Sequence, residues 1–271
     1  MDLFGNLYFN LQVDQTMHIV AIHRLIGDKQ GLTVELSAAL GVTNFEALAR
    51  LRAPGSGPFV VGVFAEDDKA SELESRLASR GFSTLTLSSA EIEREANQLF
   101  VRRFELGDQA LRIETTSGER FTVPYQDADI IVRGTGISSS TSMESRKERK
   151  FDLATAVVSG GLKVMKTTKT DREVTREDRK GFFNLYSGAS PILAFSENGL
   201  VYDALGPSRA LSSSANFLQV LAEVRKRCPG ARYDDRLLNK AGAAALLGPR
   251  LNPEEYLVIA TALLAKALRK S

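Results

Sequence analysis

Histidine and cysteine side chains are the groups that most often act as nucleophiles, general bases and metal ligands. This chain of 271 residues has two histidines, His18 and His23, and one cysteine, Cys228. The two histidines are five positions apart on an expected strand, so they face opposite sides of it. The sequence therefore predicts no histidine-assisted nucleophile, no structural zinc site, no intramolecular disulfide, and no catalytic residue or cofactor.

Paired carboxylates and glycine-rich turns are the other motifs that could carry chemistry. We expect Asp67 or Asp68 to cap the helix that follows them. We expect Asp234-Asp235 likewise to cap the helix that follows residue 235, and a calcium or magnesium site is the alternative for this second pair. The Gly-x-Gly at 134–136 follows a strand, but neither a helix nor a Gly-Lys-Ser/Thr sequence comes after it. It predicts a loop and no phosphate site.

Basic residues are dense in the middle of the chain. Between residues 144 and 180, eleven Lys or Arg stand against seven Asp or Glu. Arg146, Lys147, Arg149 and Lys150 are the candidate contacts to an anionic partner, namely RNA, DNA or anionic lipid. The alternative is a solvated, ion-paired surface, and we expect residues 134–150 to form a mobile loop within an inserted loop or helix region at 134–180.

The first 97 residues predict a small α/β domain with the order β-α-α-β-α-β. The Thr43/Glu46 spacing is that of a capping box, and Gly81 can end a helix whose apolar stripe is Ala70, Leu73 and Leu77. The expected elements are a strand at 17–26, helices at 32–40 and from 43, a strand at 59–65, a helix from 67 or 68, and a strand at 82–87.

Small and aliphatic residues recur through this domain in a framework that other proteins share. They are Glu46-Ala47, Leu51, Pro54, Val60-Val61-Gly62-Val63, Lys69-Ala70, Leu73, Leu77, Gly81 and Leu85-Thr86-Leu87. Over residues 17–88 the framework resembles the C-terminal domain of the bacterial ribosomal stalk protein and the ClpS-type protease adaptor. The resemblance implies that topology and a binding role, although Ile26-Gly27-Asp28-Lys29 stands where the adaptor has its Asn-Asp-type loop.

Residues 98–232 predict a mostly antiparallel β domain. Expected strands lie at 99–106, 110–116, 120–123, 129–133, 181–186, 192–195 and 200–205, and an amphipathic helix lies at 214–228. Short strands closed by such a helix, together with the segment 121–131, are similar to a pleckstrin-homology-like domain. In that family the helix covers one end of a bent sheet.

Residues 233–271 predict a helical tail. Asn252, Pro253 and Glu255 form an expected helix start. The following helix is apolar around more than half of its circumference, through residues that include Tyr256, Leu257, Ile259, Leu263 and Leu264. It either packs on its own domain or forms the interface of a homodimer or a protein partner.

The balance of the sequence favours a soluble α+β protein of the bacterial cytoplasm. The net charge is +2, and neither a secretory signal nor an apolar run long enough for a membrane span is expected. The leading hypothesis is a non-enzymatic adaptor that contacts another macromolecule. Binding of nucleic acid or an anionic surface through 146–180 is the first alternative. An enzyme assembled from scattered polar residues is the second, and a pocket lined by buried carboxylates would favour it.

Overall fold

The computed structural model of the chain describes residues 16–24, 29–51, 57–151, 165–188 and 190–270, without the side chains at 24, 29 and 137–178. The chain divides into two compact units, of which residues 137–179 form one and the segments before and after them form the other. Helices and sheets are both present, so the α+β class is confirmed.

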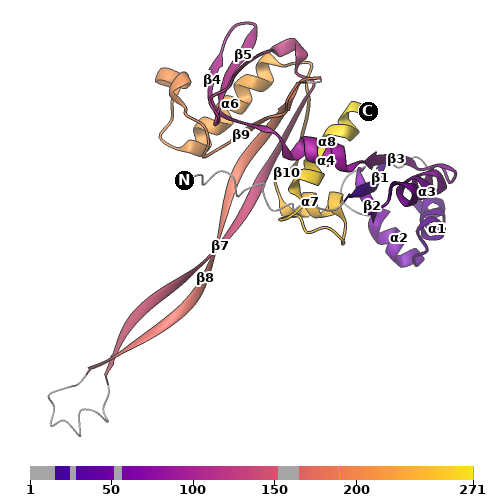
Figure 1. Ribbon diagram of the computed structural model, residues 1–271, viewed down its shortest axis with the longest axis horizontal. Helices are drawn as coiled ribbons and strands as arrows, with labels where there is room; N and C mark the ends of the chain where they lie inside the picture. Colours follow the sequence, from indigo (N-terminus) through magenta and orange to yellow (C-terminus); the bar gives the residue numbers. More distant parts are fainter. Residues whose placement is uncertain (1–15, 25–28, 52–56, 152–164, 189, 271) are drawn as a thin grey trace. The chain divides into compact units, whose positions relative to one another are not determined.

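The first sheet has three strands and follows the expected β-α-α-β-α-β order (Figure 1). Its strands are β1 His18–Arg24, β2 Phe59–Phe64 and β3 Ser83–Leu87, and its helices are α1 Lys29–Leu40, α2 Asn44–Leu51 and α3 Asp67–Ala78. β1 is central and antiparallel to both neighbours, so that Ile19 pairs with Val63 on one side and Leu87 on the other. β3 is therefore an edge strand.

The helix ends confirm one predicted cap and correct another. Glu46 Oε2 accepts a hydrogen bond from the Thr43 backbone at 2.9 Å, and Thr43 Oγ1 accepts one from the Glu46 backbone at 3.2 Å, as in a capping box. The prediction that Asp67 or Asp68 is the cap is wrong. Both lie in the first turn of α3, where the helix dipole favours carboxylates, and Glu66 occupies the N-cap position without a side-chain capping hydrogen bond.

The second sheet has seven strands in the order β10-β7-β8-β9-β4-β5-β6. They are β4 Leu99–Leu106, β5 Ala110–Thr115, β6 Arg120–Pro124, β7 Ile130–Phe151, β8 Met165–Tyr186, β9 Leu193–Ser196 and β10 Arg232–Leu237. The pairs β4–β5, β5–β6 and β8–β9 are antiparallel, but β10–β7 and β4–β9 are parallel. The sheet is thus more mixed than the sequence predicts.

The predicted loop at 134–150 is instead part of a strand. β7 runs to Phe151, and β8, its neighbour, begins at Met165, so much of the expected loop or helix region is extended chain. These residues lack the alternation of apolar and polar types that marks a strand with one buried face. Gly134 lies where a Cβ atom would come within 2.5 Å of the Phe182 ring, so a glycine is required there by close packing and not by a turn.

Two other predicted elements differ from the structure. Asp234-Asp235 does not cap a helix but lies in β10, where Asp234 accepts hydrogen bonds from the Arg236 guanidinium at 2.7 and 2.9 Å. Asn239 caps the next helix instead. The tail at 233–271, which the sequence predicts to be helical, therefore begins with residues of the strand β10. The expected strand at 200–205 is replaced in part by a short 3-10 helix, η3 Asp203–Ser208.

Helix α6 Ser213–Arg227 covers part of the second sheet, as the predicted amphipathic helix at 214–228 should. Phe217, Val220 and Leu221 join Phe183 and Phe195 in one hydrophobic cluster. The Phe183 and Phe195 rings are stacked with their centroids 4.3 Å apart. This cluster forms one hydrophobic core of the chain, between α6 and the second sheet.

The tail helices lie in a separate core that contains residues from both sheets. They are α7 Lys240–Leu247 and α8 Leu257–Lys270, and the cluster also takes in Ile19 from β1 and Ile130 from β7. α8 begins later than the expected start at Asn252. In the part of the chain that the structure describes, no helix has the length and apolar character that a membrane crossing requires.

Candidate functional site

Helix α4 Ser89–Ala96 places two carboxylates on neighbouring parts of its surface. Ser88 and Glu91 form a capping box, with Glu91 Oε2 accepting from the Ser88 backbone at 2.9 Å. Ile92 and Glu95, three residues apart, are the buried positions of the helix. A glutamate therefore occupies a position that an amphipathic helix normally gives to an apolar residue.

Glu95 is the buried acid of the site, with only 4% of its surface exposed. The Tyr186 hydroxyl donates a hydrogen bond to Glu95 Oε1 at 2.5 Å. Burial raises the pKa of Glu95 to about 7, although hydrogen bonding by Tyr186, Thr261 and Asn184 acts in the opposite direction. Burial also raises the pKa of Tyr186 well above its usual value, so this phenol keeps its proton.

Asn184 adds a second buried polar group beside this pair. It is completely buried, and it lies close enough to lower the pKa values of both Glu95 and Tyr186. Its two amide atoms nevertheless make no hydrogen bond of normal geometry with the described residues. Glu95 therefore lies in a polar cluster whose hydrogen-bonding capacity is not fully used.

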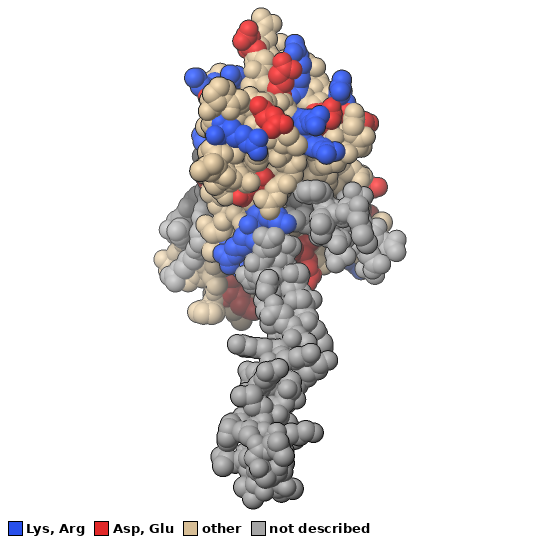
Figure 2. All heavy atoms as spheres, turned by 90° about the vertical axis from the view of Figure 1, so that its left-hand side faces the viewer, with Lys and Arg blue, Asp and Glu red and all other residues tan. Residues whose placement is uncertain are grey.

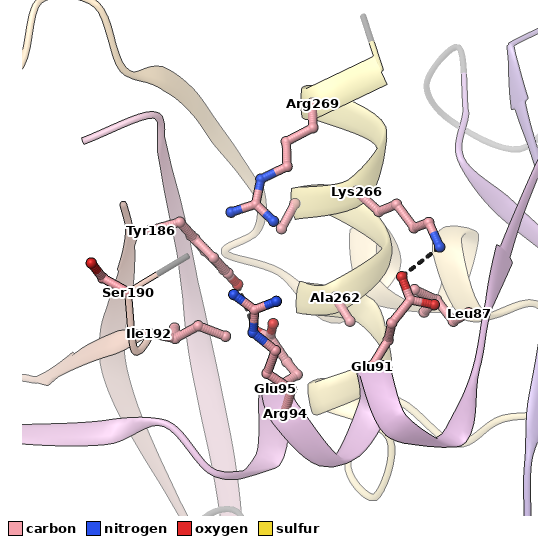
Figure 3. A pocket seen from close by; sticks show the side chains of 11 residues that line it. Leu87, Glu91, Arg94, Glu95, Tyr186, Ser190, Ile192, Ala262, Lys266 and Arg269 are labelled. Atoms are coloured by element: carbon pink, nitrogen blue, oxygen red, sulfur yellow. Dashed lines mark hydrogen bonds and ion pairs between the residues drawn. The ribbon is translucent and has the colours of Figure 1, made fainter. Parts of the chain in front are cut away.

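A pocket of about 220 Å³ lies between α4, α8 and the chain around Tyr186 (Figure 3). It combines charged and apolar walls. The lining residues are Leu87, Glu91, Arg94, Glu95, Tyr186, Ser190, Ile192, Ala262, Ala265, Lys266 and Arg269. Figure 3 shows the Arg269 side chain extending toward Tyr186, whose hydroxyl end lies beside Glu95, and the Arg269 guanidinium carbon is 5.8 Å from the centroid of the Tyr186 ring.

The three basic residues of the pocket differ in how they are paired. Lys266 Nζ lies 2.5 Å from Glu91 Oε1 and also donates to the backbone oxygen of Thr86. Arg269 uses Nε to contact Asp129 Oδ2 at 3.1 Å, and no described residue accepts a hydrogen bond from its two terminal nitrogens. Arg94 is exposed and forms no ion pair with any residue that the structure describes.

This arrangement can hold an anion. Two guanidinium groups with free donors face the pocket, and planar N–H pairs match carboxylate and phosphate oxygens. A carboxyl group with a pKa near 7 is beside them and can exist in either protonation state at neutral pH. Leu87, Ile192 and Ala262 offer apolar contact to the rest of a ligand.

The residues singled out from sequence lie elsewhere. Arg146, Lys147, Arg149 and Lys150 are in β7, and their side chains lie outside the described part of the structure. Their contact with an anionic partner stays a prediction. On the face drawn in Figure 2, basic and acidic side chains of the described residues lie among one another, as in an ion-paired surface.

The apolar residues of the tail helix pack inside the chain. Ile259, Leu263 and Leu264 are completely buried, and Tyr256 and Leu257 pack against the same cluster. Of the two interpretations of this helix, packing on its own domain accounts for these side chains. An interface through α8 would need them at the surface.

The remaining candidate chemistry is also accounted for by structure. Cys228 is buried, and burial raises the pKa of its thiol to about 11, which keeps it unreactive. His18 Nδ1 lies 3.1 Å from Asp67 Oδ1, and both His18 and His23 are half-buried. Within the described ranges, no three His, Cys, Asp or Glu side chains gather as metal ligands.

Sequence reasoning missed the pocket because its residues come from three distant segments. Glu91 to Glu95, Tyr186 to Ile192 and Ala262 to Arg269 meet only in the folded chain. The one local signal was Glu95 itself, a carboxylate three positions from Ile92 on the buried face of a short helix. No protein-family model matches this chain, and no curated protein or solved structure shows significant similarity to it.

Proposed function

We propose that this chain is a binding protein that holds a small anion in the pocket between α4 and α8. The proposal depends on one observation: the guanidinium groups of Arg94 and Arg269 both face a partly apolar pocket. Among the described residues, no carboxylate pairs with the terminal nitrogens of either group. An anion would satisfy these donors, and charge-assisted hydrogen bonds to guanidinium groups are among the stronger polar contacts in proteins.

The neighbouring groups support an anion over a cation. Glu91 is already paired with Lys266, and Asp129 with Arg269, so neither carboxylate is available as the sole ligand of a cation. Burial favours the neutral form of Glu95. The alternative hypothesis of an enzyme gains support from the same acid, but any reaction at Glu95 would first require a ligand to bind here.

Benzoate is a suitable first probe because it joins a carboxylate to a compact apolar ring. We expect isothermal titration calorimetry at pH 6 to detect one site, and Arg94→Gln or Arg269→Gln to weaken binding by about tenfold or more, since a charge-assisted hydrogen bond contributes about 1.5–3 kcal/mol. Arg112→Gln is the matched control, because Arg112 is exposed on β5 and pairs with Glu105 away from the pocket. Failure of benzoate, butyrate and inorganic phosphate to bind would overturn the proposal.

A second candidate function is that of an adaptor for another protein. Phe45 is 81% exposed and Val34 is 53% exposed, and they lie on the paired helices α2 and α1. An exposed phenylalanine on a small domain is a typical anchor for a protein partner. The proposed likeness of residues 17–88 to the stalk-protein and ClpS-type domains supports this role, since both families bind other macromolecules.

Affinity capture tests the adaptor candidate. We expect the intact chain to recover a stoichiometric protein from native lysate, and Phe45→Ser to abolish recovery because the aromatic anchor is lost. Leu218→Ser removes a comparable exposed side chain from α6 and is the control. Recovery of the chain alone, or equal recovery by both variants, would count against this candidate.

A further inference from the structure

We propose that the ligand of this pocket is a small monocarboxylate with a short apolar tail, and that it binds together with a proton held by Glu95. This inference rests on the proposed anion-binding function and specifies its ligand and its regulation. Three observations carry it: the balance of charge around Glu95, the size and lining of the pocket, and the hydrogen bond between Glu95 and Tyr186.

The balance of charge depends on the protonation state of Glu95. Arg94 on α4 and two basic residues on α8, Lys266 and Arg269, give three positive charges around the pocket. Glu91 on α4 and Asp129, just before β7, give two negative charges through their ion pairs. The site is therefore neutral when Glu95 is ionised and carries one net positive charge when Glu95 is protonated.

An anion prefers the positively charged state. Placed in the pocket beside an ionised Glu95, a carboxylate would face the like charge of a side chain that is only 4% exposed, and repulsion at a buried group is stronger than in water. Beside a protonated Glu95, the carboxylate left in the pocket lining is that of Glu91, whose charge is paired with Lys266. Anion binding must therefore raise the pKa of Glu95 further and draw a proton from solution when the pH is above about 7.

The partners of Glu95 make it the group that changes state. Tyr186 and Asn184 on β8 and Thr261 on α8 are the uncharged groups near it, and Tyr186 keeps its proton at any pH near neutrality. Burial acts to raise the pKa of Glu91, but the hydrogen bonds from Lys266 and Ser88 outweigh it and hold that pKa below its usual value. Tyr186 is thus a positioning residue whose hydroxyl holds Glu95 Oε1, while Glu95 takes up and releases the proton.

The volume of the pocket sets the size of the ligand. An apolar cavity of about 150 Å³ holds one benzene molecule. The present pocket, at about 220 Å³, is only somewhat larger. A ligand of about six to nine non-hydrogen atoms fits on this scale. Leu87, Ile192 and Ala262 can contact an apolar tail, which a phosphate ion does not have.

Calorimetry of the full chain with butyrate and benzoate at pH 6 and pH 8 tests the inference. We expect binding to be about tenfold weaker at pH 8, because only about a tenth of Glu95 remains protonated one unit above a pKa of about 7. Titrations at pH 8 in two buffers of different ionisation enthalpy should show uptake of nearly one proton per anion. Acetate should bind more weakly than butyrate, and inorganic phosphate more weakly than benzoate.

Two variants separate proton coupling from simple anion binding. Glu95→Gln should bind benzoate at pH 8 as tightly as the unaltered chain does at pH 6, with no proton uptake. Tyr186→Phe should keep the uptake but move its midpoint to higher pH, because the Tyr186 hydrogen bond lowers the pKa of Glu95 and its removal raises that pKa. A purely structural role of Tyr186 would not move that midpoint.

The outcomes distinguish this inference from the proposed function. Equal affinity at pH 6 and pH 8 in the unaltered chain, or proton uptake that persists in Glu95→Gln, overturns proton coupling and leaves anion binding intact. Phosphate binding more tightly than every carboxylate overturns the ligand class. Absence of binding by all four anions at pH 6 overturns both the inference and the function on which it rests.

Discussion

Replacement of Glu95 by glutamine is expected to remove a loss of stability of about 3 kcal/mol that the unaltered chain undergoes as the pH rises from about 4.5 to about 7. In the unfolded chain Glu95 ionises near its ordinary pKa of 4.5, whereas burial raises the pKa in the folded chain to about 7. Between these values the folded state holds a proton that the unfolded state has released. Rising pH therefore favours unfolding across this interval and has no further effect through Glu95 above it.

Urea unfolding at several pH values from 5 to 8 measures this effect. The free energy of unfolding of Glu95→Gln, relative to that of the unaltered chain, should increase with rising pH, because the unaltered chain loses stability over this range and glutamine has no proton to release. A constant offset between the two curves would reflect the altered hydrogen bond to Tyr186. Glu93→Gln is the control, since Glu93 is exposed on the same helix. Parallel curves for all three proteins would show that Glu95 is already ionised in the folded chain at low pH.

The second large effect is expected at Gly242, in the first turn of α7. A Cβ atom at this position would lie 1.9 Å from the backbone oxygen of Arg236, the penultimate residue of β10. The start of the helix is held by Asn239 Oδ1, which accepts the Gly242 backbone N–H at 2.8 Å, and the strand is held by its pairing with β7. We expect Gly242→Ala to destabilise the fold by about 3 kcal/mol or more, at the upper end of the range for overpacking.

Gly31→Ala provides the matched comparison for Gly242→Ala. Gly31 is also helical, in α1, but a Cβ atom there would meet nothing within 4 Å. Alanine should stabilise this helix by about 0.5–1 kcal/mol, because glycine loses more backbone entropy on folding. Thermal or urea unfolding of both variants should give effects of opposite sign. Equal effects would mean that the approach of Arg236 does not constrain the helix.

Local sequence signals predicted the parts of the fold that depend on neighbouring residues. Thr43 and Glu46 form the expected capping box, Gly81 has the positive φ of 83° expected near a helix end, and Ala70, Leu73 and Leu77 are the buried stripe of α3. In each case the determining contact lies within a few positions along the chain. The order of elements in the first sheet followed from such signals.

Contacts between residues far apart in the sequence account for the differences between the predicted and the observed elements. The strands β7 and β8 continue into polar sequence that has no apolar alternation, and the parallel pairing of β10 with β7 joins Tyr233 to Ile131 across a hundred residues. The pocket depends on the same kind of contact, since Tyr186 reaches Glu95 from a distant strand. No spacing in the sequence encodes such meetings, so the site could not be predicted before the fold.

The contacts between α8 and β3 occupy backbone oxygens at the edge of the first sheet. β3 lies at the edge of its sheet, where unpaired backbone oxygens could accept a strand from another molecule. Lys266 Nζ donates to the Thr86 oxygen and Lys270 Nζ to the Thr84 oxygen at 2.9 Å, so two ammonium groups cover this border. Loss of the final helical turns would expose the backbone oxygens of this edge, and pairing with strands of other molecules would then favour fibrous or amorphous aggregates.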